Sequence, residues 1–393
     1  MEDGLIDQDG STLRRFRRNL RAWYSKNARD LPWRRTTDPY RIWISEIMLQ
    51  QTTVKAVVPY FERFIDRFPT VARLANADER EVLKFWEGLG YYSRARNLHK
   101  AARTLVFDLS GRFPQSVEQL AELPGIGRYT AGAIASFAFD QRVPIVEANT
   151  LRLYCRLLGF DGDPKSSSGQ RKLWDFAASI LPRESPGRFN QALMELGATI
   201  CTPTAPACDA CPVRTCCKAF ADGTQHEIPL AARRPEVTQL TEVAVAVRKG
   251  DSWLMRRCGE GERWAGLWDF LRFGISNDEI PNGKSLAVMS LNSRKSKPKR
   301  AVPARASALQ NLERQVHEQT GLETALGELL AEISHSVTRY RIRLLCYRAE
   351  HRSGRIARAS NLKWVPSTMF GDYPLSVTGR KLARLLEIEK ARR

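Results

Sequence analysis

The spacing of apolar residues changes once along the chain, and this change is the strongest constraint on the fold. From Ser11 to about Phe220 the apolar residues recur at steps of three and four, as on one face of a helix. From about Val243 the repeat becomes two, which is typical of a strand with one face against a core. The sequence therefore predicts a multidomain protein in which an all-α core is followed by a smaller α/β domain.

The domain boundaries are placed where the pattern or the composition changes. We expect residues 1–10 to form a disordered tail and residues 11–220 to form the helical core. The segment 221–237 is polar, contains two prolines and shows no period, so we interpret it as an interdomain linker. Residues 238–388 then form the second domain.

Local signals mark the ends of several elements. Asp38 before a proline and Ser116 in a capping box predict helix starts. Lys249–Asp251 predicts a turn between two strands, and Tyr340–Cys346 alternates with arginines as a strand does. An amphipathic helix near Leu309–Gln319 is expected to end at the glycine that follows.

The charge balance points to a polyanionic partner. Lys and Arg number 62 against 43 Asp and Glu, a formal charge of +19. Residues 281–305 carry seven basic residues and no acid, which predicts a mobile loop that attracts phosphates or, equally, a solvated loop without contacts. The longest apolar stretch, Ala131–Phe139, is too short to cross a membrane, and residues 1–10 carry acids and no base, unlike a signal peptide. We expect a soluble intracellular protein without a membrane partner.

A glycine-containing turn follows Leu123. Gly125 and Gly127 allow the backbone to turn tightly before a helix that begins near Tyr129, so that successive N–H groups can face one anion. Such a hairpin grips a phosphate without reading sequence. The alternative is a plain helix–helix turn.

Five of the eight cysteines lie within residues 201–217. Four of them have the spacing C-x6-C-x2-C-x5-C, which predicts one metal centre in a reducing compartment and not a disulfide scaffold. Zinc usually takes two C-x2-C pairs, so the single pair favours a 4Fe-4S cluster while zinc stays possible. The predicted ligands are Cys201, Cys208, Cys211 and Cys217, with Cys216 as a substitute for the last in principle.

Two acids stand in apolar surroundings. Glu46 lies in a helix that is apolar on most of its circumference, where burial raises the pKa of a carboxyl and makes it a candidate general acid. The alternative for Glu46 is a structural pair with an arginine. Glu147 follows an apolar run just before a helix, where an acid is more often a helix-start charge than a catalyst.

Several motifs together resemble the adenine DNA glycosylase (MutY) family, densely over about residues 11–220. They are Leu31–Arg34, Ser45–Thr52, Gly88–Arg94, the hairpin Leu123–Gly132 and the cysteine loop. The resemblance implies a helix-hairpin-helix core with a 4Fe-4S cluster. It also implies removal of adenine mispaired with 8-oxoguanine or guanine in duplex DNA, without strand cleavage, in base excision repair.

The resemblance also assigns roles to residues. Glu46 gives a proton to adenine, and the acid at the position of Glu147 stabilises the cationic sugar; here the family has Asp-Gly-Asn and this chain has Glu-Ala-Asn. The other catalytic positions implied are Tyr129 and Asn149. The DNA contacts implied in the first domain are Arg34, Gln51, Thr52, Tyr91, Gly125 and Gly127.

The second domain more loosely resembles the family's Nudix-like reader of 8-oxoguanine. Gln315 and Gln319 stand where a Nudix hydrolase has glutamates, so we expect the domain to bind and not to cut. Ser334 and His335 resemble the Phe-Ser-His recognition loop, with Ile333 in place of Phe.

Three other functions are considered. A bifunctional glycosylase-lyase needs a lysine nucleophile where this hairpin has Tyr129, and an oxidised-nucleotide hydrolase needs the missing glutamates. A mismatch-binding protein without activity remains open because of Glu147. We expect a monomer, cytoplasmic or nucleoid-associated if bacterial.

Overall fold

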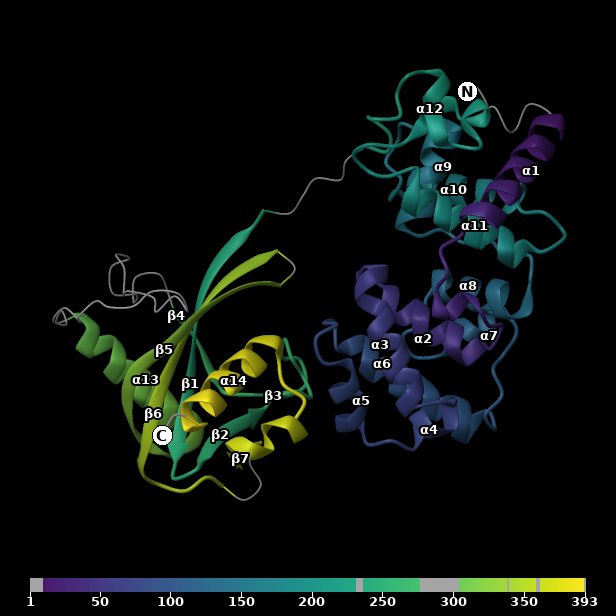
Figure 1. Ribbon diagram of the computed structural model, residues 1–393. Helices are drawn as coiled ribbons and strands as arrows, with labels where there is room; N and C mark the ends of the chain where they lie inside the picture. The colour runs from purple at the N-terminus through teal and green to yellow at the C-terminus, as the bar shows by residue number, and fades with distance from the viewer. Residues whose placement is uncertain (1–9, 231–235, 276–303, 338, 358–360, 392–393) are drawn as a thin grey trace. The chain divides into compact units, whose positions relative to one another are not determined.

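The computed structural model describes residues 10–230, 236–275, 304–337, 339–357 and 361–391. By their contacts the residues group into two units, Met1–Ala77 with Arg94–Arg233 and Asp78–Ser93 with Arg234–Arg393. The first unit is helical, whereas the second is built on a sheet (Figure 1). The predicted order, a helical part followed by a smaller α/β part, is confirmed.

The helices of the first unit are joined by turns and by longer loops such as residues 200–217. They are α1 (Gly10–Asn27), α2 (Pro39–Leu49), α3 (Val54–Arg67), α4 (Val71–Ala75), α6 (Ser93–Arg103), α7 (Val117–Glu122), α8 (Arg128–Phe139), α9 (Ala148–Leu158), α10 (Ser167–Ile180), α11 (Pro186–Thr199) and α12 (Lys218–Ala221). Gly10, predicted to lie in the tail, opens α1.

The predicted helix starts are confirmed. The Asp38 carboxylate accepts the N–H of Tyr40 at 2.9 Å and Pro39 is the first residue of α2, where its missing N–H costs nothing. Ser116 caps α7 through the N–H of Gln119 at 3.2 Å. These caps fix where α2 and α7 enter the fold, and α2 carries Glu46.

The first helix returns to pack against the end of the unit. Phe16 of α1 meets Phe189 of α11 edge to face, with ring centroids 6.1 Å apart, and both rings are fully buried. The same core takes in apolar residues of α9 and α10 and the buried Cys201. Segments distant in the sequence thus enclose one core beside the cysteine loop (Figure 1).

Residues 78–93, which include α5 (Glu79–Trp86), group with the second unit. Arg380 holds Glu87 by two bonds, 2.6 Å from Nε to Oε1 and 2.9 Å from Nη2 to Oε2. The Leu375 N–H also donates to Glu87, at 3.1 Å. Charge-assisted pairs of this bidentate form are the strong ones, so the segment is firmly joined to its unit.

The second unit contains one mixed sheet of seven strands. The path is β3-β2-β1-β6-β5, with β4 paired to β1 and β7 to β2, and only β1 and β6 run parallel among these pairs. Its elements are β1 (Thr238–Lys249), β2 (Ser252–Arg257), β3 (Trp268–Asp269), β4 (Leu271–Ile275), α13 (Ala304–Thr320), β5 (Glu323–Val337), β6 (Tyr340–Ser353), β7 (Leu362–Pro366) and α14 (Val377–Ala391).

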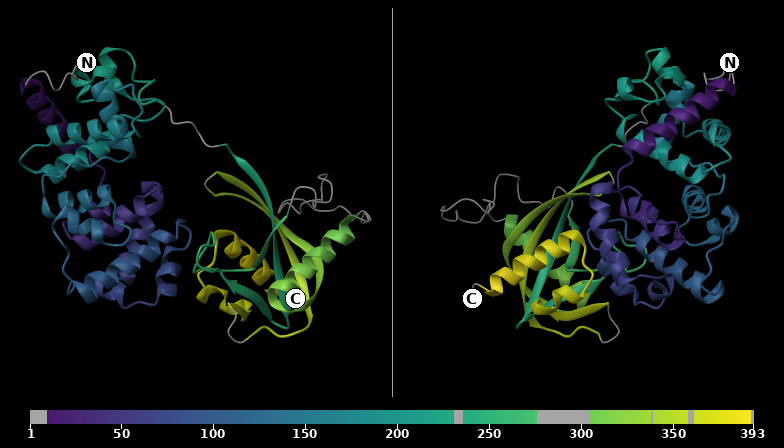
Figure 2. Two further views of the ribbon diagram at one scale, coloured as in Figure 1. Left: turned by 180° about the vertical axis from the view of Figure 1, so that it is seen from behind. Right: turned by 45° about the vertical axis from the view of Figure 1, so that its right-hand side comes forward.

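Each face of the sheet is covered by one helix, because side chains alternate along a strand. On β1, Val243, Val245 and Val247 pack with α13, whereas Ala244 and Ala246 pack with α14. Figure 2 shows the green α13 and the yellow α14 on opposite sides of the strands. The predicted strand, turn and helix of this half are therefore confirmed.

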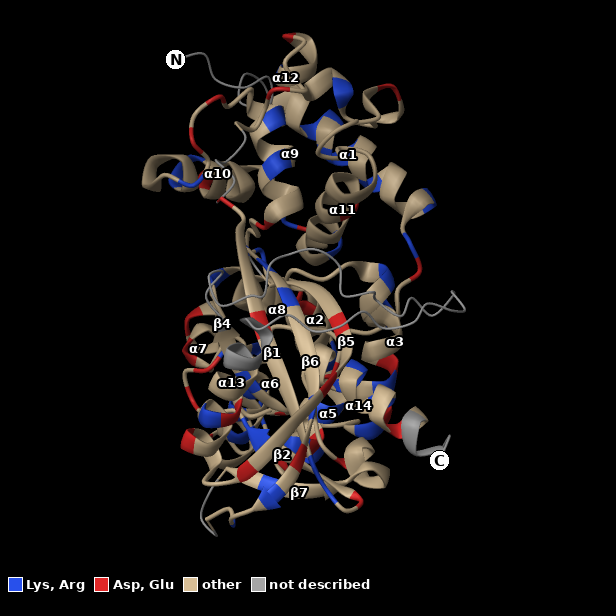
Figure 3. Ribbon diagram, turned by 90° about the vertical axis from the view of Figure 1, so that its left-hand side faces the viewer, with Lys and Arg blue, Asp and Glu red and all other residues tan. Residues whose placement is uncertain are grey.

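Two predictions fall largely outside the described residues. They concern the tail, of which Gly10 alone is described, and the basic stretch 281–305, of which the last two residues lie in α13. Lys and Arg, drawn blue in Figure 3, occur on helices and strands of both units. No helix in the described part of the chain has the length and apolar character to cross a membrane.

Candidate active site and candidate metal centre

A cavity of about 650 Å³ opens between the helices of the first unit. It is lined from α2 and the turn after it, from the start of α8, from the start of α9 and from α11. Seven predicted site residues line it: Arg34, Glu46, Gln51, Thr52, Tyr129, Glu147 and Asn149. The fold therefore brings together all four predicted catalytic residues, which come from three separate segments.

Glu46 lies near the end of α2 with only 4% of its surface exposed. Its Oε2 accepts a hydrogen bond from the Tyr129 hydroxyl at 2.7 Å. Burial raises the pKa of Glu46 to about 7; the Tyr129 bond opposes the rise and the charge of Glu147 adds to it. A carboxyl with this pKa keeps its proton in a large fraction of molecules near neutral pH, as a general acid requires.

The structural alternative for Glu46 was a pair with an arginine. Among the described residues no ion pair to Glu46 occurs, and the nearby Arg34 is bound to Glu195 at 2.8 Å. The partner of Glu46 is instead the hydroxyl of a tyrosine in the first turn of α8. Burial, followed by the charge of Glu46, raises the pKa of Tyr129 well above its ordinary value, so Tyr129 remains a neutral donor.

Glu147 is the N-cap of α9. Its Oε1 accepts the N–H of Thr150 at 2.8 Å, and its Oε2 accepts the backbone N–H of Asn149 at 2.9 Å and the side-chain Nδ2–H at 3.2 Å. Burial raises the pKa of Glu147, and the two backbone bonds act against the rise. The carboxylate thus caps a helix and lines the cavity at once, so both predicted roles are compatible with its position.

Ala148 stands where the family has glycine, and this replacement causes no backbone strain. Ala148 is the first residue of α9 and is not among the residues with a positive φ. Arg152, one turn further along α9, makes no ion pair with Glu147 in the residues that the structure describes. It donates instead to Asn149 Oδ1 at 3.0 Å and to the carbonyls of Gly197 and Cys201, each at 2.8 Å.

Sequence reasoning missed Glu195. Its carboxylate is fully buried on α11 and is bonded by Arg29 at 2.7 Å and by Arg34 at 2.8 Å. Burial acts to raise the pKa of Glu195, but the hydrogen bonds of Arg29 and Arg34 lower it to about 2. The sequence does contain a sign of Glu195, because it is an acid on an apolar helix face, the same feature that identifies Glu46 as a candidate.

The predicted DNA-contacting residues of the hairpin lie where a phosphate can approach. Gly125 has φ +78°, and a Cβ there would lie 2.7 Å from Asn97 Cβ, so the position requires glycine. Gly127 is the N-cap of α8, and a Cβ on it would meet nothing within 4 Å. The N-terminus of α8 is therefore open to an anion.

Gln51, Thr52 and Tyr91 lie in two turns with unusual backbone. Gln51 is exposed with φ 56°, and Tyr91 is 44% exposed with φ 47°. Residues other than glycine rarely adopt a left-handed backbone conformation, and those that do are concentrated at functional sites. Thr52 Oγ1 accepts from Arg94 Nη2 at 3.3 Å.

Ser334 and His335 do not lie in a loop, which corrects the expectation. They belong to β5, paired with Arg343 and Ile342 of β6. Ser334 is exposed, and His335 is partly buried with neither ring nitrogen hydrogen-bonded. Burial, then the charge of Arg272, lowers the pKa of His335. Ile333, at the position of the family's Phe, is buried in the core under α14.

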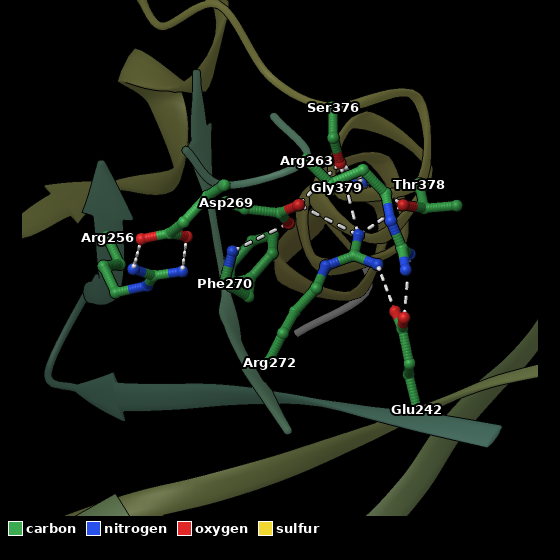
Figure 4. A network of polar contacts seen from close by, with 10 residues as sticks. Glu242, Arg256, Arg263, Asp269, Phe270, Arg272, Ser376, Thr378 and Gly379 are labelled. Carbon is green, nitrogen blue, oxygen red and sulfur yellow. Dashed lines mark hydrogen bonds and ion pairs between the residues drawn. The ribbon is translucent and has the colours of Figure 1, made fainter. Parts of the chain in front are cut away.

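A polar network supports this part of the sheet (Figure 4). Arg272 reaches Asp269 at 2.9 Å and Glu242 at 3.5 Å, and it also bonds Thr378. Its guanidinium lies 4.3 Å from the ring centroid of Trp264, whose ring is 6.3 Å from that of His335. The network thereby holds the Trp264 ring next to His335.

The four predicted ligands line one small cavity. Cys201, Cys208, Cys211 and Cys217 border it together with Arg156, whereas Cys216 does not. None of the chain's eight cysteines, all of them described, forms a disulfide. Within the described residues no three acidic, His or Cys side chains meet closely enough for a single metal ion, whereas a cluster of several atoms spaces its thiolates further apart.

Arg156 organises this cavity from α9. It is 2% exposed, donates to Cys201 Sγ at 3.2 Å and binds the carbonyls of Thr202 at 2.8 Å and Ile228 at 2.9 Å. A buried arginine beside cysteine sulfurs compensates thiolate charge, so the donor set fits a soft, thiolate-bound metal group.

Comparison with known proteins places this architecture in a class. Residues 44–179 match the family model of the HhH-GPD superfamily base excision DNA repair proteins. The adenine DNA glycosylase of Buchnera aphidicola from Acyrthosiphon pisum is 38% identical over 252 residues, which cover 64% of this chain and 72% of the relative. The chain belongs to the adenine DNA glycosylase family.

Animal relatives match over a smaller share of their length. The adenine DNA glycosylase of Rattus norvegicus is 45% identical over 57% of this chain, and the human protein is 45% identical over 54%. The matched region is 45% of the rat protein and 40% of the human protein, so the chain spans less than half of these relatives. A solved thermostable thymine-DNA glycosylase, 29% identical, covers 54% of this chain and 98% of its own with a TM-score of 0.50.

Proposed function

We propose that this protein is a monofunctional adenine DNA glycosylase that removes adenine mispaired with 8-oxoguanine or guanine in duplex DNA. The observation that carries the proposal is Glu46: a buried carboxyl with a pKa of about 7, bonded to Tyr129 beside a cavity of about 650 Å³. A glycosidic bond is not accessible inside the base stack, so the adenine has to leave the helix to reach this cavity.

The chemistry follows from the two acids. Protonated Glu46 gives its proton to a ring nitrogen of adenine, and the bond from sugar to base breaks with its electron pair going to the base. Glu147 lies beside the cavity, where its ionised carboxylate, which the N–H groups of α9 favour, stabilises the cationic sugar. Glu46, now ionised, accepts a proton from the attacking water, which leaves an abasic sugar.

Tyr129 and Asn149 position these acids. Tyr129 fixes Oε2 of Glu46, and Asn149 donates to Glu147 from its backbone and its side chain. A lyase reaction requires an amine nucleophile, and no lysine is among the described residues that line the cavity. This supports hydrolysis without strand cleavage.

The DNA contacts we propose follow the exposed turns. Gly125 and Gly127 present the N-terminus of α8 to a phosphate. Gln51 enters the duplex near the vacated position, and Tyr91 inserts beside 8-oxoguanine. Arg34 and Thr52 line the cavity and contact the flipped nucleotide. We also propose that the protein is a monomer and that it acts on the chromosome, at the nucleoid if bacterial.

The second unit is proposed to be a Nudix-like reader of 8-oxoguanine. Ser334 is exposed on β5 and can meet a base edge, and the ring of His335 lies beneath the surface next to it, with both ring nitrogens buried and without a hydrogen-bond partner in the described residues. Gln315 and Gln319 lack the carboxylates of a hydrolase, which argues against hydrolysis of nucleotides.

We also propose that Cys201, Cys208, Cys211 and Cys217 hold a 4Fe-4S cluster. The support is the shared cavity, the exclusion of Cys216 from it and the buried guanidinium of Arg156. A bound cluster would join these four cysteines within one loop and would supply a redox-active group there.

A single-turnover assay tests the function. Duplexes with adenine opposite 8-oxoguanine, guanine or thymine are incubated with excess protein and analysed with and without alkali. We expect alkali-dependent cleavage at the adenine opposite 8-oxoguanine and guanine. Binding without any abasic product would instead indicate a mismatch-binding protein, and cleavage without alkali would indicate a lyase.

A further inference from the structure

Thr150 and Glu147 hold each other at the start of α9. The Thr150 hydroxyl accepts the backbone N–H of Glu147 at 2.8 Å and donates to the Glu147 carbonyl at 3.2 Å. In return the Thr150 backbone N–H donates to Glu147 Oε1 at 2.8 Å. Both halves of a capping box are therefore present, and the Thr150 side chain is fully buried.

This reciprocal pair matters because of the length of Glu147. A glutamate has one more rotatable bond than an aspartate, so its carboxylate needs more restraint to stay at one place. Two anchors supply the restraint: the bonds to Asn149 and Thr150 N–H at the carboxylate end, and the Thr150 hydroxyl at the backbone end. Without the hydroxyl, the Glu147 N–H is left without its partner and the extended backbone of Glu147 loses its anchor.

We propose that Thr150 is a positioning residue for excision, which fixes Glu147 so that the longer carboxylate lies at the sugar. The inference rests on the proposed glycosylase function. Thr150 does not line the cavity, so it acts through Glu147 and not on the substrate. Ala148 supports the same arrangement, because it begins the helix with an ordinary helical backbone.

The competing explanation is that Thr150 is only a helix cap. The two explanations differ in whether the Thr150 hydroxyl also affects the ionisation of the Glu147 carboxyl. The charged or titratable groups that interact electrostatically with Glu147 are Glu46 of α2, Tyr129 of α8, and Arg152 and Tyr154 of α9. Burial raises the pKa of Glu147, and the backbone N–H groups of Asn149 and Thr150 lower it. The Thr150 hydroxyl fixes the backbone that aims the carboxylate at these N–H groups, so its loss weakens both bonds and moves the acid limb of the rate profile to higher pH, because Glu147 has to be ionised.

The test is Thr150→Val, which keeps the shape and removes the hydroxyl. The single-turnover excision rate on adenine opposite 8-oxoguanine is expected to fall by about 10- to 10²-fold, since a misplacement of about 1 Å costs up to about 10²-fold. Affinity for a duplex with a non-cleavable adenosine analogue is expected to stay unchanged. Thr150→Ser restores the hydroxyl and the rate.

Thr70→Val is the matched control. Thr70 caps α4 through the N–H of Arg73 at 3.2 Å and does not line the cavity, so its loss lowers the melting temperature but not the rate. If Thr150→Val melts lower but excises like the wild type, Thr150 is a cap alone and the proposal is wrong. Thr150→Cys, with a weakly bonding group of similar size, gives the same readout if the valine variant does not fold.

A cycle with Glu147→Gln separates the inference from the function on which it rests. If Thr150 acts through Glu147, then Thr150→Val has no further effect on the rate in the Glu147→Gln background. An equal loss in both backgrounds contradicts the proposal. Failure of the wild-type protein to release adenine contradicts the proposed function itself, which is a different result.

Discussion

Replacement of Tyr129 by phenylalanine tests how the acidity of Glu46 is set. The hydroxyl donates to Glu46 Oε2 at 2.7 Å, and this bond favours the ionised carboxylate. Removing it leaves burial and the charge of Glu147, both of which raise the pKa of Glu46. The variant is therefore expected to hold its catalytic proton to higher pH than the wild type.

The size of the shift follows from the strength of the bond. A hydrogen bond to a charged group is worth about 1.5–3 kcal/mol, and about 1.4 kcal/mol corresponds to one pKa unit. The basic limb of the excision rate, expected near the Glu46 pKa of about 7, should move up by about one to two pH units. The maximal excision rate of the variant can fall for other reasons, so the readout is the pH at which the basic limb of the rate profile lies.

The assay is single-turnover excision from a duplex with adenine opposite 8-oxoguanine, measured between about pH 5.5 and pH 9.5 at constant ionic strength. Tyr154→Phe is the control: this buried hydroxyl bonds the Ile145 carbonyl at 3.2 Å and does not line the cavity, so its loss should leave the limb in place. A limb that does not move in the Tyr129 variant, or that moves to lower pH, would refute the reasoning.

The remaining predictions concern the second acid, the cysteines and the second unit. Glu147→Gln should slow excision by at least about 10²-fold, whereas Glu147→Asp keeps the charge and stays active; a Gln variant that only melts lower would make the acid structural. The purified protein should contain about four irons per chain, and serine at any cavity-lining cysteine should lower the iron content while Cys216→Ser does not; stoichiometric zinc would contradict the cluster. Ser334→Ala with His335→Ala should reduce the preference for 8-oxoguanine over guanine by about 1–3 kcal/mol, and an unchanged preference would rule out the reader role.

The period of the apolar residues predicted the order of the two folds, because the side chains that a helix or strand buries repeat with the period of that element along the sequence. On β1, alternate residues face two different cores, and this alternation is visible in the sequence. The N-cap at Asp38 could be predicted for the same reason, since its bond spans two residues.

Contacts between distant segments could not be predicted from local patterns. The bond from Tyr129 to Glu46 spans 83 positions, and the pair of Arg34 with Glu195 spans 161. The resemblance to a family brought Glu46 and Tyr129 into one site, but it gave no sign of Glu195. These contacts depend on how α2, α8 and α11 pack.

The recognition loop was the wrong expectation for a physical reason. Ile333 is buried while Ser334 and Ser336 are exposed, an alternation that is typical of a strand. Pairing of β5 with β6 continues through this segment, from Ala331 to Val337.

The central claim is that Glu46 is the acid that releases adenine. Glu46→Gln keeps the shape and can still accept the Tyr129 bond, but it cannot donate a catalytic proton. In single-turnover reactions on adenine opposite 8-oxoguanine, the wild type is expected to form abasic sites and the variant to lose at least about 10²- to 10⁴-fold in rate while binding the duplex within a few-fold of the wild type. Excision by the variant at close to the wild-type rate would contradict the claim.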